Sequence, residues 1–333
     1  MNRFAFTLSE GTRTALRRYV GYPFFFLFAF LISAYLSFPY DRVREVIERQ
    51  VAVAVPGSEL EIVSLEPSWV SGVELTGVSL RIPSETEGER PMSVTFPRVW
   101  ARVGMLSYLF GTTSLSYEVE VDGGGIIEGS FEDESDDDHA RSHLIVHLQN
   151  VDLRRIGPLR TATRLPVTGV VTGDIDVILD DESEETVGEV SLDIADASLG
   201  DGRAGLTIPG MPGAITVERL ALGTITVRAE IEHGTARITQ LVANGEDAEL
   251  RGSGTVRLVR PVRNCALDVL LRINVLPGYR ERNDRTRGIF GLADMSPDVR
   301  PYRAADGAFQ LRLQGTLGGR VTAVAAGAAS MPD

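Results

Sequence analysis

From about residue 58 onward, apolar and polar residues alternate with a period of two, and this pattern constrains the fold more than any other feature of the chain. In GDIDVILD, Ile175, Val177 and Leu179 fall on one side of an extended chain, whereas Asp174 and Asp176 fall on the other. The same alternation occurs in ELEIVSL, GVELTGVSLRI, TSLSYEVEVDG, EVSLDIADASL, AITVERLALGTITVRAEI, AELRGSGTVRL, ALDVLLRINVL and AFQLRLQGTL. Turn-forming residues separate these runs at short intervals, so the sequence predicts a mostly β protein of successive antiparallel strands.

Each predicted strand has one apolar face, and that face needs cover. The sheet must fold on itself, pack against a second sheet, or present the face to an apolar ligand. Closed packing is the commoner outcome in proteins, so both a sandwich and an open trough are considered. We expect a β-rich domain over residues 58–318, which is long enough for two domains or one elongated architecture, and a flexible tail over residues 319–333.

The second constraint is an uncharged stretch between Arg18 and Asp41. A helix from Tyr19 to Phe38 has about the 20 residues that cross the hydrocarbon core of a bilayer. No pair of small residues flanks a cleavage point at the end of the run, so the sequence predicts a retained transmembrane helix over residues 19–40 and not a cleaved signal. A buried helix of a soluble protein is the alternative, which three consecutive phenylalanines disfavour.

Aromatic residues stand at both ends of this predicted span. Tyr19 and Tyr22 at one end, and Tyr35 and Phe38 at the other, are expected at the two membrane interfaces. The flanking arginines slightly favour residues 1–18 as a short cytoplasmic tail, with the bulk of the chain on the far side. Apolar residues at helical spacing then predict a short helix over residues 41–57, leaving the bilayer.

The composition excludes some partners. The net charge of −13, with 33 arginines and no lysine, argues against nucleic acid or an anionic lipid surface as the main partner. The single cysteine, Cys265, allows no internal disulfide and is expected as a small core residue on a strand.

Two segments interrupt the alternation. Residues 131–142 contain six carboxylates within seven positions and are predicted as a solvated acidic loop; the run lacks the ligand spacing and turn glycine of a calcium loop. Residues 276–307 carry several arginines without a clear period and are predicted as a long loop, either functional or covering the sheet edge.

Candidate chemistry is sparse. His139, His143 and His147 are spaced by four, but HLIVHL alternates, so His143 and His147 are expected to point to solvent from a strand. A zinc site would need a third ligand with support from neighbouring groups. No nucleophile elbow, Walker loop or C-x-x-C motif occurs, and the GSG at 252–254 lies inside a strand pattern. We therefore predict no catalytic, cofactor-binding or metal-ligating residues and no enzyme activity.

Several quoted stretches resemble a known family. The sequence FPYDRVREVIERQV, followed by ELEIVSLEPSWVSGVELTGVSLRIP, resembles the type II secretion system protein N family (GspN). The similarity continues through PRVWARVGMLSYLFGTTSLSYEVEVDGGGIIEGSF, VDLRRIGPL, LPVTGVVTGDIDVIL and ITQLVANGEDAELRGSGTVRLVRPVRNCALDVLLRINVLP, from about residue 20 to about residue 317. The cadence of GVELTGVSL and DAELRGSGTVRL is also similar to that of AsmA-like proteins, which carry apolar troughs between membranes.

The resemblance implies a single-pass protein of the inner membrane of a Gram-negative cell, with an elongated, curved antiparallel sheet in the periplasm. It implies an accessory role in the type II secretion system, which exports folded proteins across the outer membrane, through contacts with secretion proteins of the inner membrane and periplasm. No catalytic residues follow from it. The AsmA-like similarity implies the alternative, a lipid-binding or lipid-transfer protein that holds phospholipid in an apolar β trough.

One turn offers candidate partner-contact residues. In EPSWVSG, Trp69 stands in a turn, where a large aromatic side chain is costly to leave exposed. Packing of Trp69 on the first strands is the preferred interpretation, and contact of Trp69 and Val70 with a partner is the alternative.

Overall fold

The computed structural model describes thirteen segments of the chain. They are residues 17–36, 40–54, 58–68, 71–82, 92–104, 112–133, 141–155, 166–180, 185–203, 205–207, 214–259, 264–316 and 321–326. Phe38, Trp69, Val70 and most of the acidic run lie outside the described residues, as does the end of the predicted tail from residue 327.

Fourteen strands form one antiparallel sheet in which spatial order follows chain order, and this confirms the prediction of a mostly β protein. The strands of this sheet are β1 (Glu59–Ser68), β2 (Gly72–Ile82), β3 (Met92–Val103), β4 (Thr113–Val121), β5 (Gly125–Asp133), β6 (Arg141–Asp152), β7 (Val167–Asp180), β8 (Val187–Leu199), β11 (Leu220–Glu232), β12 (Thr235–Asn244), β13 (Ala248–Arg257), β14 (Ala266–Val275), β15 (Phe309–Thr316) and β16 (Thr322–Ala325). Between β8 and β11, the short strands β9 (Gly205–Thr207) and β10 (Ala214–Thr216) pair with each other.

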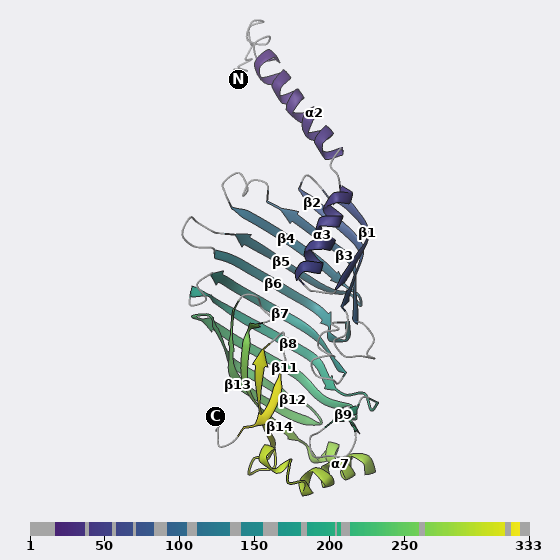
Figure 1. The fold of residues 1–333 in the computed structure, drawn as a ribbon, viewed down its shortest axis with the longest axis vertical. Helices are drawn as coiled ribbons and strands as arrows, with labels where there is room; N and C mark the ends of the chain where they lie inside the picture. The colour runs from purple at the N-terminus through teal and green to yellow at the C-terminus, as the bar shows by residue number, and fades with distance from the viewer. Residues whose placement is uncertain are drawn as a thin grey trace, which may run out of the picture.

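The helical elements lie at the two ends of the sheet, except for one turn, η2, which lies between β6 and β7. They are the π-helical turn η1 (Arg17–Gly21), α2 (Tyr22–Leu36), α3 (Tyr40–Ala54), the 3-10 turn η2 (Leu153–Arg155), α6 (Pro277–Arg280), α7 (Asp284–Met295) and the 3-10 turn η5 (Arg300–Tyr302). Figure 1 shows α2 projecting beyond the β1 end of the sheet. Within the described segments, no helix combines the length and apolarity required to cross a membrane. The anchor predicted over residues 19–40 therefore stays a prediction.

Residues 276–307, predicted as a long loop, contain α6, α7 and η5, so that prediction is wrong in this respect. The physical reason for the helix α7 is an N-terminal cap within this arginine-rich stretch. The side chain of Asn283 accepts a hydrogen bond from the backbone N–H of Thr286, and the Thr286 hydroxyl accepts one from the backbone N–H of Asn283. These two hydrogen bonds form a capping box. Thr286 and Ala293 are buried on the inner side of the helix that follows.

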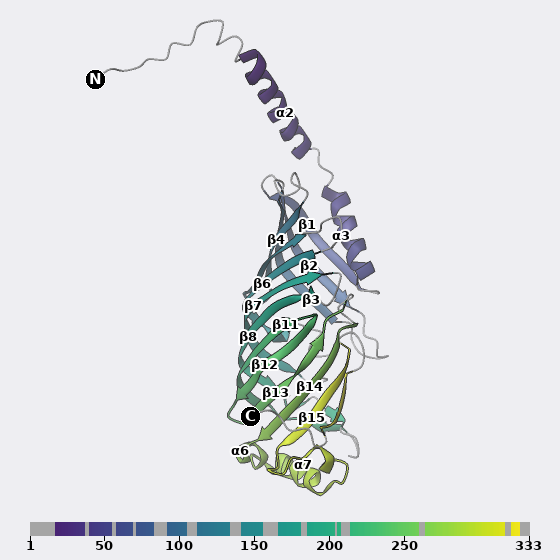
Figure 2. The same cartoon turned by 90° about the vertical axis from the view of Figure 1, so that its left-hand side faces the viewer.

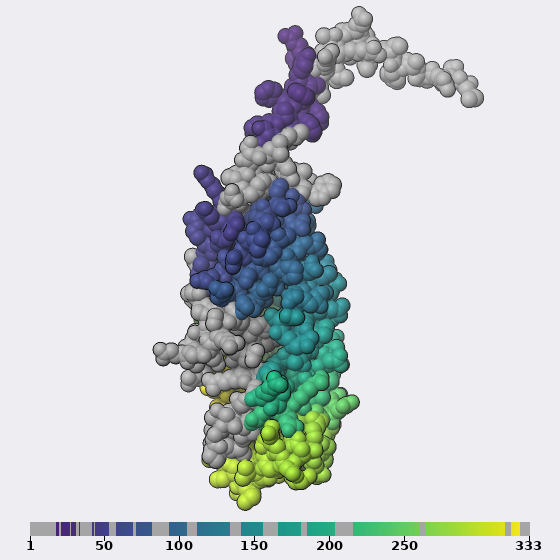
Figure 3. Space-filling model, turned by 90° about the vertical axis from the view of Figure 1, so that its right-hand side faces the viewer, coloured from purple at the N-terminus to yellow at the C-terminus, as the bar shows by residue number. Residues whose placement is uncertain are grey.

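The sheet curls along its long axis. Figure 2 shows β6–β8 on one side of the view and α3, β14 and β15 on the other, so both ends of the sheet turn toward the side that carries α3. On that side, Ile47 of α3 packs against the buried side chains of Ile62, Leu75 and Val78. Figure 3 shows an elongated body that ends in the helical segment around α7.

Fully buried side chains form small clusters rather than one central core. One cluster contains Val121, Val151, Leu153 and Val171, and a second contains Ala197, Leu222, Ala243 and Ala248. Cys265, directly before β14, is 1% exposed and is a free thiol, in line with the predicted core position. Small clusters are expected here, because the described residues contain no second large sheet for the first to pack against.

Candidate functional site

One face of the sheet carries apolar side chains from its first strand to its last. We call it the apolar face. Its first row of directly opposed residues is Leu65, Leu75, Val99, Val119, Ile127, Leu148, Gly173, Leu192, Val227, Leu241, Gly252, Leu271, Leu311 and Ala325. Its second row is Pro67, Val73, Ala101, Tyr117, Gly129, Val146, Ile175, Val190, Ala229, Ile238, Gly254, Val269, Leu313 and Ala323.

A third row extends the apolar face from β3 to β15. It consists of Val103, Leu115, Phe131, Leu144, Val177, Gly188, Ile231, Ala236, Val256, Leu267 and Gly315. None of the three rows contains a charged residue, and the hydroxyl of Tyr117 is the single polar side-chain group in them. Opposed residues on neighbouring strands lie about 5 Å apart, so each row is a continuous apolar track across the sheet.

The apolar face is incompletely covered. In the first two rows, Leu75, Ala229 and Val269 are buried, and most of the other side chains are partly exposed. In a sandwich, a second sheet about 10 Å away would bury these central positions. Within the described residues, the second sheet is only the β9–β10 pair, which is too small to do so. Within the described segments, the structure therefore has one large sheet whose apolar face is partly exposed and is not covered by a second large sheet.

The opposite face, which we call the polar face, carries charges and ion pairs. One of its rows is Arg102, Ser116, Ser130, Ile145, Asp176, Glu189, Glu230, Arg237, Thr255, Asp268, Gln314 and Thr322. Arg228 Nη2 lies 2.8 Å from Asp193 Oδ2, and Thr226 also donates a hydrogen bond to Asp193. The hydrogen bond from Arg228 is the main reason why the pKa of Asp193 is below its usual value.

The histidines lie on the polar face, where the alternation placed them. His143 Nε2 is 2.7 Å from an oxygen of Asp176, and His147 Nδ1 is 2.6 Å from an oxygen of Asp174. Within the described residues, no group of three or more potential ligands could hold a metal ion. His139, the third histidine of the predicted spacing, lies outside the described residues. The zinc alternative therefore gains no support from this part of the chain.

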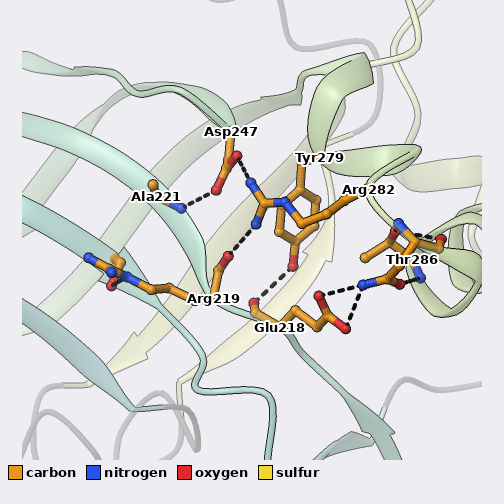
Figure 4. A network of polar contacts seen from close by, with 9 residues as sticks. Glu218, Arg219, Ala221, Asp247, Tyr279, Arg282 and Thr286 are labelled. Atoms are coloured by element: carbon orange, nitrogen blue, oxygen red, sulfur yellow. Dashed lines mark hydrogen bonds and ion pairs between the residues drawn. The ribbon is translucent and has the colours of Figure 1, made fainter.

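A polar network attaches the helical segment to the sheet (Figure 4). Arg282 forms an ion pair with Asp247 and donates a hydrogen bond to the carbonyl oxygen of Arg219 at 3.1 Å. The second oxygen of Asp247 accepts from the backbone N–H of Ala221 at 2.8 Å, and the Asp247 side chain is only 6% exposed. These contacts join the helical segment to β11 and to the turn between β12 and β13, and so hold the helices in place.

Tyr279 is the buried centre of this attachment. Its hydroxyl donates to the carbonyl oxygen of Glu218 at 2.8 Å, and the guanidinium of Arg282 lies 4.9 Å from the centre of its ring. Burial, with a smaller contribution from the Glu218 charge, raises the pKa of Tyr279 to about 12. A phenol with so high a pKa stays protonated at physiological pH and acts here as a hydrogen-bond donor.

The same helical segment covers the β15 end of the apolar face. The Phe290 ring of α7 packs edge-on against Tyr279 at 6.2 Å between ring centres, and it lies 6.4 Å from the ring of Phe309. Phe309 opposes Ile273 on β14, on the apolar side of the sheet. The helices thus close one end of the face, as α3 covers the other.

Two of the residues predicted from the sequence, Tyr19 and Tyr22, lie apart from this face. Tyr19 and Tyr22 are 76% and 58% exposed on η1 and α2, which project away from the sheet. Tyr35 is on α2, but its side chain is outside the description, as are Phe38, Trp69 and Val70 entirely. Sequence reasoning did not identify the three rows as a candidate binding surface. The alternation of apolar and polar residues shows which residues of a strand share a face, but the rows appear only when the register between neighbouring strands is known.

Comparison of the chain with protein-family models, with curated proteins and with solved structures found no match.

Proposed function

We propose that this protein binds phospholipid through its acyl chains, which lie along the apolar face of the fourteen-stranded sheet. The observation that carries the proposal is the set of three unbroken rows that contain no charge and are still partly exposed. Apolar surface in contact with water gains about 25 cal/mol for each Å² that a ligand covers. A face with these properties favours an apolar ligand and offers almost nothing to a polar one.

The size of the face fits long chains. At about 4.8 Å between neighbouring strands, the sheet is about 60 Å long, twice the thickness of the hydrocarbon core of a bilayer. A small apolar molecule would need only a few of these strands. An uninterrupted track of this length supports a ligand with long hydrocarbon chains, or several such ligands one after another.

The lack of polar groups in the three rows favours an acyl chain over a peptide strand or a sugar as the ligand. Those ligands carry many hydrogen-bonding groups that must be satisfied when water is removed. The three rows provide one hydroxyl and no charged side chain for that purpose. A phospholipid satisfies the condition, because its chains need no partner and its head group stays in water at the edge of the sheet.

The N-terminal helix is part of the proposal. The helix α2 exposes a series of large apolar side chains, namely Phe24, Phe25, Phe26, Phe28 and Phe30, and it lies at the β1 end of the sheet. We propose that the segment over residues 19–40 inserts in the inner membrane, which would place the β1 end of the apolar face beside the lipid source. The orientation with the sheet in the periplasm follows from the arginine bias and the resemblance.

The resemblance to the GspN family supports a second proposal, an accessory role in type II secretion through contacts with secretion proteins. Affinity purification from gently solubilised membranes tests it. Recovery of secretion components is the expected result, and their absence together with unchanged export after deletion of the gene would exclude the role.

A photo-crosslinking experiment tests the lipid proposal. The full chain carries benzoylphenylalanine at Val190 on the apolar face or, as the matched control, at Glu189, its neighbour on the polar face. Cells with radiolabelled phospholipid are irradiated, and labelled protein is measured after denaturing electrophoresis. We expect labelling of the Val190 variant only. Equal labelling of both variants, or crosslinks from Val190 to protein alone, would overturn the proposal.

A further inference from the structure

Tyr117 is the single polar side chain in the three rows of the apolar face, and it faces the proposed ligand. It lies in the second row, between Ala101 of β3 and Gly129 of β5. Its side chain is partly exposed. Within the part of the chain that the structure describes, the hydroxyl has no hydrogen-bond partner, whereas the buried hydroxyl of Tyr279 has one.

The ring of Tyr117 lies flat along the sheet. A Cβ atom added to Gly129 would come within 2.6 Å of the Tyr117 hydroxyl oxygen and 2.7 Å of the ring carbon that bears it. The hydroxyl is therefore held over the backbone of the neighbouring strand and does not extend away from the sheet. Glycine at position 129 provides the space that this arrangement requires.

A hydroxyl in this position needs an acceptor when a ligand covers it. Water can accept its hydrogen bond while the face is empty, but an acyl chain that displaces this water offers no acceptor, and an unpaired phenol then costs free energy. Partial burial already raises the pKa of Tyr117, which keeps the group a donor. A ligand that carries its own acceptor next to its hydrocarbon chain removes this cost.

We propose that the Tyr117 hydroxyl donates a hydrogen bond to an ester carbonyl of the bound lipid and so fixes where the ester region lies along the face. This inference rests on the proposed lipid binding. An ester carbonyl is the acceptor that directly adjoins the acyl chain of a phospholipid, whereas phosphate and head group lie further from the chain. Tyr117 is thus a specificity residue that distinguishes ester-linked from ether-linked lipids.

Binding measurements with two lipids test the inference. The full-length protein in detergent is titrated with ester-linked and with ether-linked phosphatidylglycerol of equal chain length, by competition with a fluorescent lipid. We expect the unaltered chain to prefer the ester by about three- to tenfold, the contribution of one hydrogen bond. In Tyr117→Phe, which keeps the ring over Gly129, we expect the preference to disappear while the affinity for the ether lipid stays unchanged.

The control is Tyr302→Phe, which removes a hydroxyl from η5 outside the three rows and should keep the ester preference. An equal affinity of the unaltered chain for both lipids, or an ester preference that survives in Tyr117→Phe, overturns the inference and leaves the proposed function standing. If the unaltered chain binds neither lipid, the proposed function and this inference both fail.

Discussion

The two faces of the sheet are made by the same strands, yet they differ in almost every property that governs contact with water. On β7, Ile175 and Val177 lie on the apolar face, whereas Asp174 and Asp176 on the polar face contact His147 and His143. Both faces are partly exposed. Exposure alone therefore does not separate a solvated surface from a binding surface, but the presence or absence of polar partners does.

The two faces differ in how many of their groups already have a partner. The polar face keeps its groups paired across strands, so it gains little from any additional partner. The apolar face leaves hydrophobic free energy unused, because most side chains in its three rows are partly exposed. A ligand of matching length recovers that free energy.

The shape of the apolar face depends on the backbone at Gly173. Its φ of +154° is a conformation that other residues rarely adopt, and an added Cβ would collide with the carbonyl oxygen of Ser191 on β8. We expect Gly173→Ala to lower the free energy of unfolding by about 3 kcal/mol. Urea unfolding followed by circular dichroism measures this.

The control lies in the same row. At Gly252 the atoms nearest to an added Cβ would belong to the side chains of Leu241 and Leu271, which can move, and not to the backbone. Gly252→Ala should therefore cost less than about 1 kcal/mol. Equal losses in the two variants would mean that side-chain packing, and not the backbone at Gly173, shapes the face.

A pair of neighbours on β6 tests the two faces directly. Val146 lies in the second row of the apolar face, and Ile145 lies on the polar face between Ser130 and Asp176. We expect Val146→Asn to lower the free energy of unfolding by about 2 kcal/mol, because the amide has no partner among apolar neighbours. Ile145→Asn should cost less than about 1 kcal/mol. Chemical denaturation of both variants checks the order, and a larger loss for Ile145→Asn would break the comparison.

Much of the sheet could be predicted from the sequence. Alternation of the kind seen at Ile175 and Val177 placed strands in most of the correct segments, and the same alternation put His143 and His147 on the polar face. Strands that follow one another through short turns pair as hairpins, so antiparallel order followed as well. These features depend on neighbours in the chain, which the sequence shows directly.

What the sequence could not show depends on contacts between distant segments. Which residues form a row depends on the register between neighbouring strands. The irregular pairing of β12 with β13 between Ile238 and Leu241 shifts this register. Whether a second sheet covers the apolar face is likewise invisible in an alternating pattern. The α7 helix was missed because its capping box uses Asn283 and Thr286 in place of the commoner Ser or Thr with Glu, in a run dominated by arginine.

Acid is expected to weaken the ion pair between Asp193 and Arg228 on the polar face. Because the hydrogen bond from Arg228 holds the pKa of Asp193 below its usual value, the folded state favours the charged form of this carboxylate. Its contribution to stability is therefore fully present above the usual aspartate pKa of about 4, and it is lost as the pH falls through the lower pKa of the folded state. Asp193→Asn should reduce the loss of stability between pH 6 and pH 2 by less than about 1 kcal/mol, since the pair is exposed.

Two controls assign this acid dependence to the ion pair on the polar face. Asp196 lies on the same strand and has no ion pair within the described residues, so Asp196→Asn should leave the loss unchanged. Val146→Asn should also leave it unchanged, because none of the three rows named on the apolar face contains a carboxylate or a histidine. Thermal unfolding at pH 6 and pH 2 gives all three values. If Asp193→Asn loses as much stability between pH 6 and pH 2 as the unaltered chain, the Asp193–Arg228 pair does not contribute to the acid sensitivity of the sheet.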